Sequence, residues 1–172
     1  MDRRTHRRGF LLGSVAALAT TRLTTQAAPR LFQAATPQGQ GADWQAVAQA
    51  LGAKGQKMPG DVFRVGMPRT DLQVTVQNVP VKAGFALGSY AAFKQTGNET
   101  VVMGDLVLLD QEVNPVMTGL FENGLAVTAL HNHLLDVVPH VMYLHVAGSG
   151  DAVQLATANR KALSASKTPR GE

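Results

Sequence analysis

Four of the five histidines in this 172-residue sequence lie within the fifteen residues from His131 to His145. Neutral imidazole nitrogens are ligands that zinc, copper, nickel and iron accept in proteins. His131 and His133 are two residues apart, and residues two apart in a β-strand point to the same face. The cluster therefore predicts a site for a divalent transition metal, with zinc or copper as the preferred ions.

A β-hairpin is predicted to bring a third histidine to this site, with its turn just before His140. In the predicted register, His131 lies opposite His145 and His133 lies opposite Tyr143. Cβ atoms directly opposite one another in such a pair are about 4.5–5.5 Å apart. Three imidazoles and one phenol would then share a face, and His140 is expected to lie outside the metal ligands.

A carboxylate could complete the ligand set. Glu112 is the preferred candidate, because it lies in a predicted loop just before a helix start at Asn114-Pro115. Asp105 and Asp136 are weaker candidates, and Asp136 could instead orient a histidine. If the metal activates a water molecule for hydrolysis, Glu112 is the candidate base and Tyr143 the candidate acid.

One basic residue could also do chemistry. Arg69, in the segment Pro-Arg-Thr-Asp, could bind a substrate carboxylate because its planar guanidinium matches a carboxylate in two hydrogen bonds. An ion pair between Arg69 and Asp71, or between Arg69 and Asp105, is the favoured interpretation.

The elements that must position these residues predict an α+β fold. Turn signals and apolar periodicity predict helices at 44–51, 115–123 and 152–163, and strands at 62–65, 72–76, 85–93, 100–109, 125–135 and 140–147. Strands outnumber helices. The order predicts a mainly antiparallel sheet with helices packed on one face, ending in a β-hairpin followed by a helix.

The first 27 residues predict a signal peptide of the twin-arginine type. Arg7 and Arg8 are followed by Phe10 and an apolar stretch of about ten residues, which is too short to span a membrane. Ala27 is a small residue at the position expected before a cleavage site. We therefore expect export by the twin-arginine route, to the periplasm or as a secreted protein.

The remaining chain is expected to divide into a linker at 28–41, a single domain at 42–165 and a flexible tail at 166–172. The linker is rich in Pro, Gly, Gln and Ala. An exposed edge strand of the predicted sheet could pair two copies of the domain, so a homodimer is a further expectation.

The net charge of +4 comes from the predicted signal peptide. Residues 1–27 hold five of the sixteen basic residues and one of the twelve acidic residues, which leaves eleven of each in the rest of the chain. We therefore expect no nucleic-acid partner. The absence of cysteine excludes disulfides, thiolate ligands and a lipid-anchored cysteine, so no stable membrane anchor is expected after signal removal.

Five segments carry a family resemblance: PRTDLQVTV (68–76), ALGSYAAF (86–93), VVMGDLVLLDQEVNPVM (101–117), GLAVTALHNHLL (124–135) and PHVMYLHVAGSGDAVQLA (139–156). Together they resemble the LppY/LpqO lipoprotein family, an exported bacterial domain of unknown function that many members carry in two copies. The resemblance implies an exported location and no established activity. The resemblance also implies that six residues are positions of the family pattern: Glu112, Asn114, Pro115, His131, His133 and His145.

Three functions are compatible with these observations. The favoured one is an exported binding protein that holds a transition metal, or a small molecule through that metal. The second is a metal-dependent, hydrolase-like enzyme acting on a cell-envelope or small-molecule substrate. The third is a structural or interaction module of the envelope, without metal, in which the histidines are merely packed.

Overall fold

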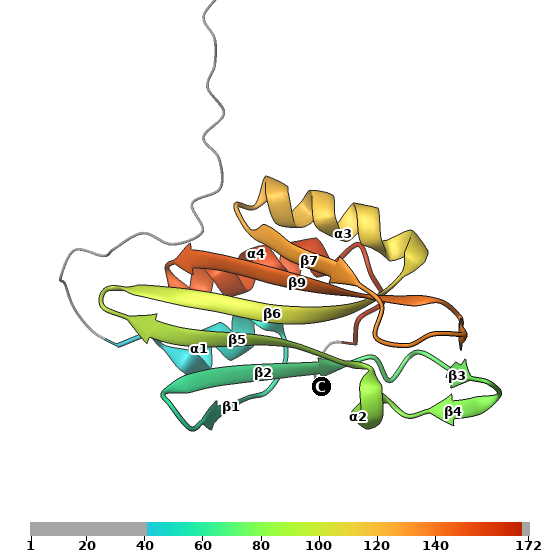
Figure 1. Ribbon diagram of the computed structural model, residues 1–172. Helices are drawn as coiled ribbons and strands as arrows, with labels where there is room; N and C mark the ends of the chain where they lie inside the picture. The colour runs from blue at the N-terminus through green and yellow to red at the C-terminus, as the bar shows by residue number, and fades with distance from the viewer. Residues whose placement is uncertain (1–40, 170–172) are drawn as a thin grey trace, which may run out of the picture.

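The computed structural model describes residues 41–169, so the predicted signal peptide and residues 28–40 of the predicted linker lie outside the described part. The predicted α+β class is confirmed: helices cover one face of a six-stranded antiparallel sheet (Figure 1). The elements are α1 Trp44–Leu51, β1 Gly55–Met58, β2 Val62–Pro68, β3 Val74–Val76, β4 Val79–Val81, α2 Ala83–Ala86, β5 Gly88–Thr96, β6 Glu99–Leu109, α3 Asp110–Glu122, β7 Ala126–His131, β8 Val137–Val138, β9 Val141–Gly150 and α4 Ala152–Leu163.

The large sheet has the strand order β1-β2-β5-β6-β9-β7, and all neighbouring strands in it are antiparallel. β6 and β9 form its longest pair, which runs from Thr100 opposite Gly150 to Leu109 opposite Val141. A small sheet of order β4-β3-β8 lies at one end of the large one (Figure 1). We call the face of the large sheet that is turned away from α1, α3 and α4 the open face.

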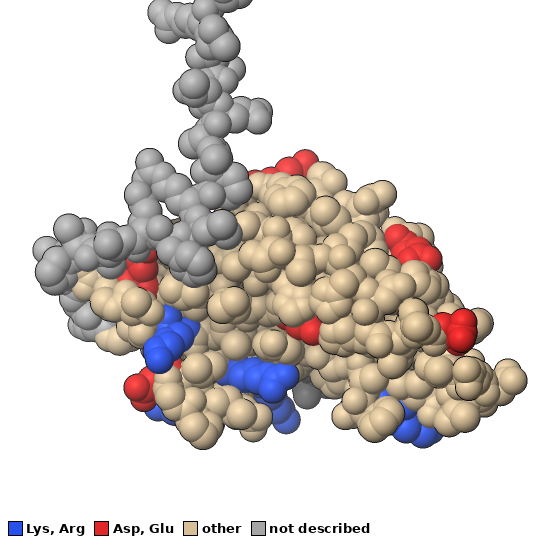
Figure 2. Space-filling view, in the orientation of Figure 1, with Lys and Arg blue, Asp and Glu red and all other residues tan. Residues whose placement is uncertain are grey.

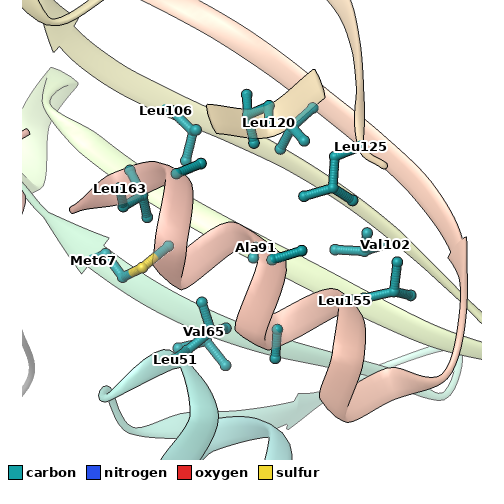
Figure 3. Close-up of a cluster of buried hydrophobic side chains, with 14 of the residues drawn as sticks. Leu51, Val65, Met67, Ala91, Val102, Leu106, Leu120, Leu125, Leu155 and Leu163 are labelled. Atoms are coloured by element: carbon teal, nitrogen blue, oxygen red, sulfur yellow. The ribbon is translucent and has the colours of Figure 1, made fainter. Parts of the chain in front are cut away.

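The main core lies between the large sheet and these three helices (Figure 3). Val102 and Leu106 of β6 are fully buried there, and Leu155 and Leu163 of α4 belong to the same cluster. Because side chains alternate along a strand, Asp105 next to Leu106 is directed to the open face. The pattern that builds the core thus also decides which residues of β6 can contribute to a site.

A second, smaller core lies on the other side of the sheet, where β6 and β9 meet the small sheet. Val107 of β6 and Tyr143 of β9 pack there with Val74, Leu87 and Val137. This packing joins the small sheet to one end of the open face.

Helix α3 begins earlier than the predicted start at Asn114-Pro115. The helix runs from Asp110, and Pro115 lies inside it. Glu112 accounts for the earlier start, because its carboxylate accepts the backbone N–H of Leu109, the residue before the helix, at 2.9 Å. Acidic residues in a first turn also stabilise a helix through its dipole.

Strand β7 ends at His131, whereas the sequence predicts a strand as far as residue 135. The residues that follow include β8, in which Val137 pairs with Val76 and Val138 with Thr75 of β3. The connection between β7 and β9 is therefore a loop that joins the two sheets, and it is not the tight turn that we predicted.

The predicted tail at 166–172 is described as far as Pro169. In this part the backbone N–H of Lys167 donates to Glu112 at 2.9 Å, and Thr168 is buried. These contacts hold the start of the segment against α3.

None of the helices within residues 41–169 has the length and apolar character needed to cross a membrane.

Candidate metal centre

Three of the four predicted hairpin histidines come together on the open face of the sheet. His145 lies in β9, His131 is the last residue of β7, and His133 follows in the loop after β7. His131 and His145 are partly buried and His133 is exposed. Figure 2, which views the molecule as Figure 1 does, shows charged side chains scattered over this face and no continuous basic surface among the described residues.

The imidazoles are close enough to share one ion. Nε2 of His131 and Nε2 of His145 are 2.8 Å apart. The ring centroids of His131 and His133 are 4.7 Å apart, and those of His131 and His145 are 4.9 Å apart. One ring nitrogen from each of the three histidines lies within 4.8 Å of the other two, so this group could hold a metal ion.

The register of β7 against β9 differs by two residues from the predicted one. His131 lies opposite Tyr143 and Ala129 lies opposite His145, so the predicted pairs are not Cα partners in the ladder. The side chains of His131 and His145, and those of His133 and Tyr143, are nevertheless in contact. The predicted turn is centred one residue too close to β9, because the sequence does not indicate that β8 pairs with β3. Since side chains alternate with a period of two, a shift by two residues keeps His131 on the predicted face.

Tyr143 supports the histidines with its ring and directs its hydroxyl elsewhere. Its ring stacks on that of His133 with centroids 3.7 Å apart. Its hydroxyl donates to the backbone oxygen of Ala86 at 2.8 Å. Burial raises the pKa of Tyr143, and the nearby negative charge of Asp105 raises it further. The structure therefore does not aim this hydroxyl at the histidines as the predicted acid.

Glu112 is not brought to the histidines. Its carboxylate pairs with the guanidinium of Arg69, with Oε2 at 2.7 Å from Nη1 and Oε1 at 3.2 Å from Nη2. The backbone N–H groups of Leu109 and Lys167 supply two more hydrogen bonds. Burial by itself raises the pKa of Glu112, but these donors outweigh it and hold the pKa below its usual value. All four of these hydrogen bonds hold the carboxylate of Glu112 at Arg69 and the start of α3, and the three-histidine group does not include it.

Arg69 is fully buried and all five of its N–H groups have acceptors. Two bonds go to Asp71, both at 2.9 Å, two to Glu112, and one to the backbone oxygen of Val107 at 2.7 Å. Burial lowers the pKa of Arg69, and the hydrogen bonds to Asp71 and Glu112 outweigh this and raise it. The predicted pair with Asp71 is confirmed, whereas Glu112 is a partner that sequence spacing did not indicate.

His140 lies outside the three-histidine group, as predicted. Its Nδ1 is 2.7 Å from Oδ1 of Asp110, at the start of α3. Its Nε2 is 3.1 Å from Nδ2 of Asn132, the residue between His131 and His133. This surface contact ties the loop that carries His133 to α3.

The two weaker carboxylate candidates differ in position. Asp136 is exposed and has a positive φ of 54° in the loop before β8. Asp105 lies in β6, where its Cα partner in β9 is His145. The three-histidine group therefore has one of the predicted carboxylates, Asp105, as its strand neighbour.

Three imidazoles arranged in this way suit a tetrahedral ion with one open position. Zinc takes histidine nitrogens at about 2.0–2.1 Å, which places two such nitrogens about 3.3 Å apart in a tetrahedron. The separation of Nε2 of His131 from Nε2 of His145, 2.8 Å, is shorter than that value, and one ring nitrogen from each of the three histidines lies within 4.8 Å of the other two.

A comparison with curated proteins finds no match, and neither does a comparison with solved structures. A family described as Domain of Unknown Function (DUF1259) matches residues 45–165. That range is more than half of the chain and includes both the three-histidine group and the Arg69 cluster. The chain therefore belongs to this family of unknown function.

Proposed function

We propose that this protein is an exported metal-binding protein that holds a divalent transition metal, zinc or copper, through His131, His133 and His145. The convergence of their three ring nitrogens within 4.8 Å carries the proposal. A small molecule could bind through the open coordination position that three histidines leave.

The closest contact in the group supports a cation between the rings. Nε2 of His131 and Nε2 of His145 are 2.8 Å apart, and two unprotonated ring nitrogens at that distance would oppose their lone pairs. A proton shared between the rings relieves this in the metal-free protein. A divalent cation can replace that proton and accept the lone pair of His133 as well.

The same geometry favours binding over hydrolysis. Glu112, the predicted base, is engaged by Arg69, and Tyr143, the predicted acid, donates to Ala86. General acid–base catalysis needs such groups within hydrogen-bond reach of the reacting atoms. We therefore propose a binding role as the primary function.

We further propose that the protein is exported by the twin-arginine route and belongs with LppY/LpqO-like proteins within its family. The support is the Arg7-Arg8 pair with the apolar stretch that follows, and the five segments that resemble that group. Export that persists after replacement of Arg7 and Arg8 by lysines, measured by fractionation, would contradict the twin-arginine route.

The metal proposal is tested by elemental analysis. The untagged protein is purified without chelator and its metals are measured by plasma mass spectrometry. We expect near-stoichiometric zinc or copper in the native protein and its loss from the double variant His131→Ala/His145→Ala. The loss is expected because one imidazole cannot replace the three that hold the ion.

His140→Ala is the matched control, because it removes a neighbouring histidine that lies outside the group. We expect this variant to keep its metal. A native protein without metal, which also fails to bind added zinc or copper in calorimetry, would contradict the proposal. The histidines would then have only a packing role, in an interaction module.

A further inference from the structure

Asp105 lies next to the proposed metal site on the open face. It is opposite His145 in the pairing of β6 with β9, and opposite Tyr90 in the pairing of β5 with β6. Residues directly opposite one another point to the same face, with Cβ atoms about 4.5–5.5 Å apart. The carboxylate of Asp105 is therefore within one strand spacing of His145.

One oxygen of this carboxylate has no partner. Oδ1 of Asp105 is buried and accepts no hydrogen bond from the residues that the structure describes. A buried carboxylate oxygen without a donor is costly, and most such atoms in proteins are paired. Glu112, by contrast, accepts four hydrogen bonds.

The ring of His145 can supply the donor. Its Nε2 faces Nε2 of His131, so Nδ1 is the nitrogen left on the side of the strand. Nδ1 is bonded to the ring carbon that carries Cβ, so it is the ring nitrogen nearer to the backbone of β9 and to the neighbouring residue Asp105. Within residues 41–169, no hydrogen bond joins Nδ1 of His145 to another group.

We propose that Asp105 is the positioning residue of the metal site: its carboxylate accepts the Nδ1–H of His145 and so presents the lone pair of Nε2 to the metal. The inference rests on the proposed metal-binding function. Histidines that bind metals almost always donate their second ring N–H to a carboxylate or a carbonyl, and this bond fixes the tautomer and raises the basicity of the ligand nitrogen.

Asp105 is too short to serve as a direct ligand. A zinc ion bound to Nε2 lies about 2 Å beyond that nitrogen, on the far side of the ring from the strand. The carboxylate of a residue opposite His145 reaches only the near side of the ring. Asp105 is therefore assigned to the ring of His145 and not to the ion.

The first test measures zinc affinity by competition with a chromophoric chelator. We expect Asp105→Ala to bind zinc about 10- to 100-fold more weakly than the native protein. Asp105→Asn should fall between the two, because an amide oxygen still accepts the Nδ1–H but carries no charge. Asp110→Ala removes a carboxylate from a histidine outside the group and is the matched control, with an expected change below about threefold.

A second measurement separates positioning from ligation. The absorption bands of the Co²⁺-substituted protein should keep their position in Asp105→Ala, because the coordinating atoms are unchanged. Affinity within twofold of the native value, or a shifted band, would each overturn the assignment.

A third measurement does not need a metal. Imidazole ¹⁵N correlation spectra of the metal-free native protein should show His145 protonated on Nδ1, and Asp105→Ala should lose this preference. Protonation of His145 on Nε2 in the native protein would overturn the pairing. Lack of metal binding together with the Nδ1–H tautomer would contradict the proposed function but not the Asp105–His145 pair.

Discussion

Two clusters of polar side chains lie near the β6–β9 pair, and they differ in the hydrogen bonds that their polar atoms make. In the Arg69 cluster, five N–H donors meet five acceptors, and each oxygen of Glu112 accepts two bonds. In the histidine cluster, two Nε2 atoms face each other at 2.8 Å. The fully satisfied buried network stabilises the fold, whereas the three ring nitrogens that converge on the open face could hold a metal ion.

The position of the Arg69 cluster fits its structural role. It ties the segment after β2 to the start of α3 and, through the N–H of Lys167, to the segment after α4. Both central side chains are buried, with 0% of Arg69 and 6% of Glu112 exposed. The sequence suggested that the Arg69 guanidinium could bind the carboxylate of a substrate. In the structure it binds carboxylates of the protein itself, and the cluster joins three parts of the chain.

Breaking the Arg69 cluster should have the largest effect on stability. Glu112→Ala leaves the Arg69 charge buried with one carboxylate fewer, and removal of one partner of a buried pair costs about 3–5 kcal/mol. The free energy of unfolding is measured by urea denaturation. Glu122→Ala, on an exposed glutamate of the same helix, should change it by less than about 0.5 kcal/mol. If Glu112→Ala lowered the free energy of unfolding by less than about 1 kcal/mol, the structural role of the Arg69 cluster would be contradicted.

Zinc should stabilise the protein through the histidine cluster alone. Free zinc at a hundred times the dissociation constant adds about 2.7 kcal/mol to the free energy of unfolding, because it binds only the folded state. His131→Ala should abolish this gain and change the metal-free protein little. Thermal denaturation with and without zinc measures both. If zinc stabilised His131→Ala as much as it stabilises the native protein, the ion would bind somewhere other than the histidine cluster.

Alternation in the strands accounts for what could be predicted of the site. The face shared by His131, His145 and Tyr143 follows from the period of two, and it survives a register shift of two residues. The pairing itself depends on β8, whose two residues pair with a strand about sixty residues earlier in the chain. Nothing local in a Val-Val-Pro segment indicates that partner.

Glu112 is bonded to Arg69 and not to the histidines for a related reason. Asn114-Pro115 is a strong local signal for a helix start, and it placed Glu112 in a loop that could face the histidines. The true start depends on hydrogen bonds from Leu109 and on Arg69, which is 43 residues away in the sequence. The partner at two residues, Asp71, was predictable because the chain holds it close to Arg69.

Acid should weaken the Arg69 cluster in a defined pH range. The pKa of Glu112 is lowered in the folded protein, so its contribution to stability is present above the unfolded value near 4.5. That contribution is lost as the pH falls from there through the lowered folded pKa. Urea denaturation across this range should show a smaller pH dependence in Glu112→Gln than in the native protein. If the free energy of unfolding depended on pH equally in the two proteins, the contribution of Glu112 to the Arg69 cluster would be contradicted.

The smallest effect is expected at the pair of His140 and Asp110, which resembles a metal-site pair in chemistry but not in setting. Side-chain exposures of 43% and 60% let water screen the contact, and exposed pairs contribute less than about 1 kcal/mol. Asp110→Asn should lower the free energy of unfolding by no more than this. It should change zinc affinity by less than about threefold, because it loosens only the loop that carries His133. A tenfold loss of zinc affinity would mean that the loop positions His133 as strictly as β9 positions His145. The histidine cluster would then depend on its surrounding hydrogen bonds as much as the Arg69 cluster does.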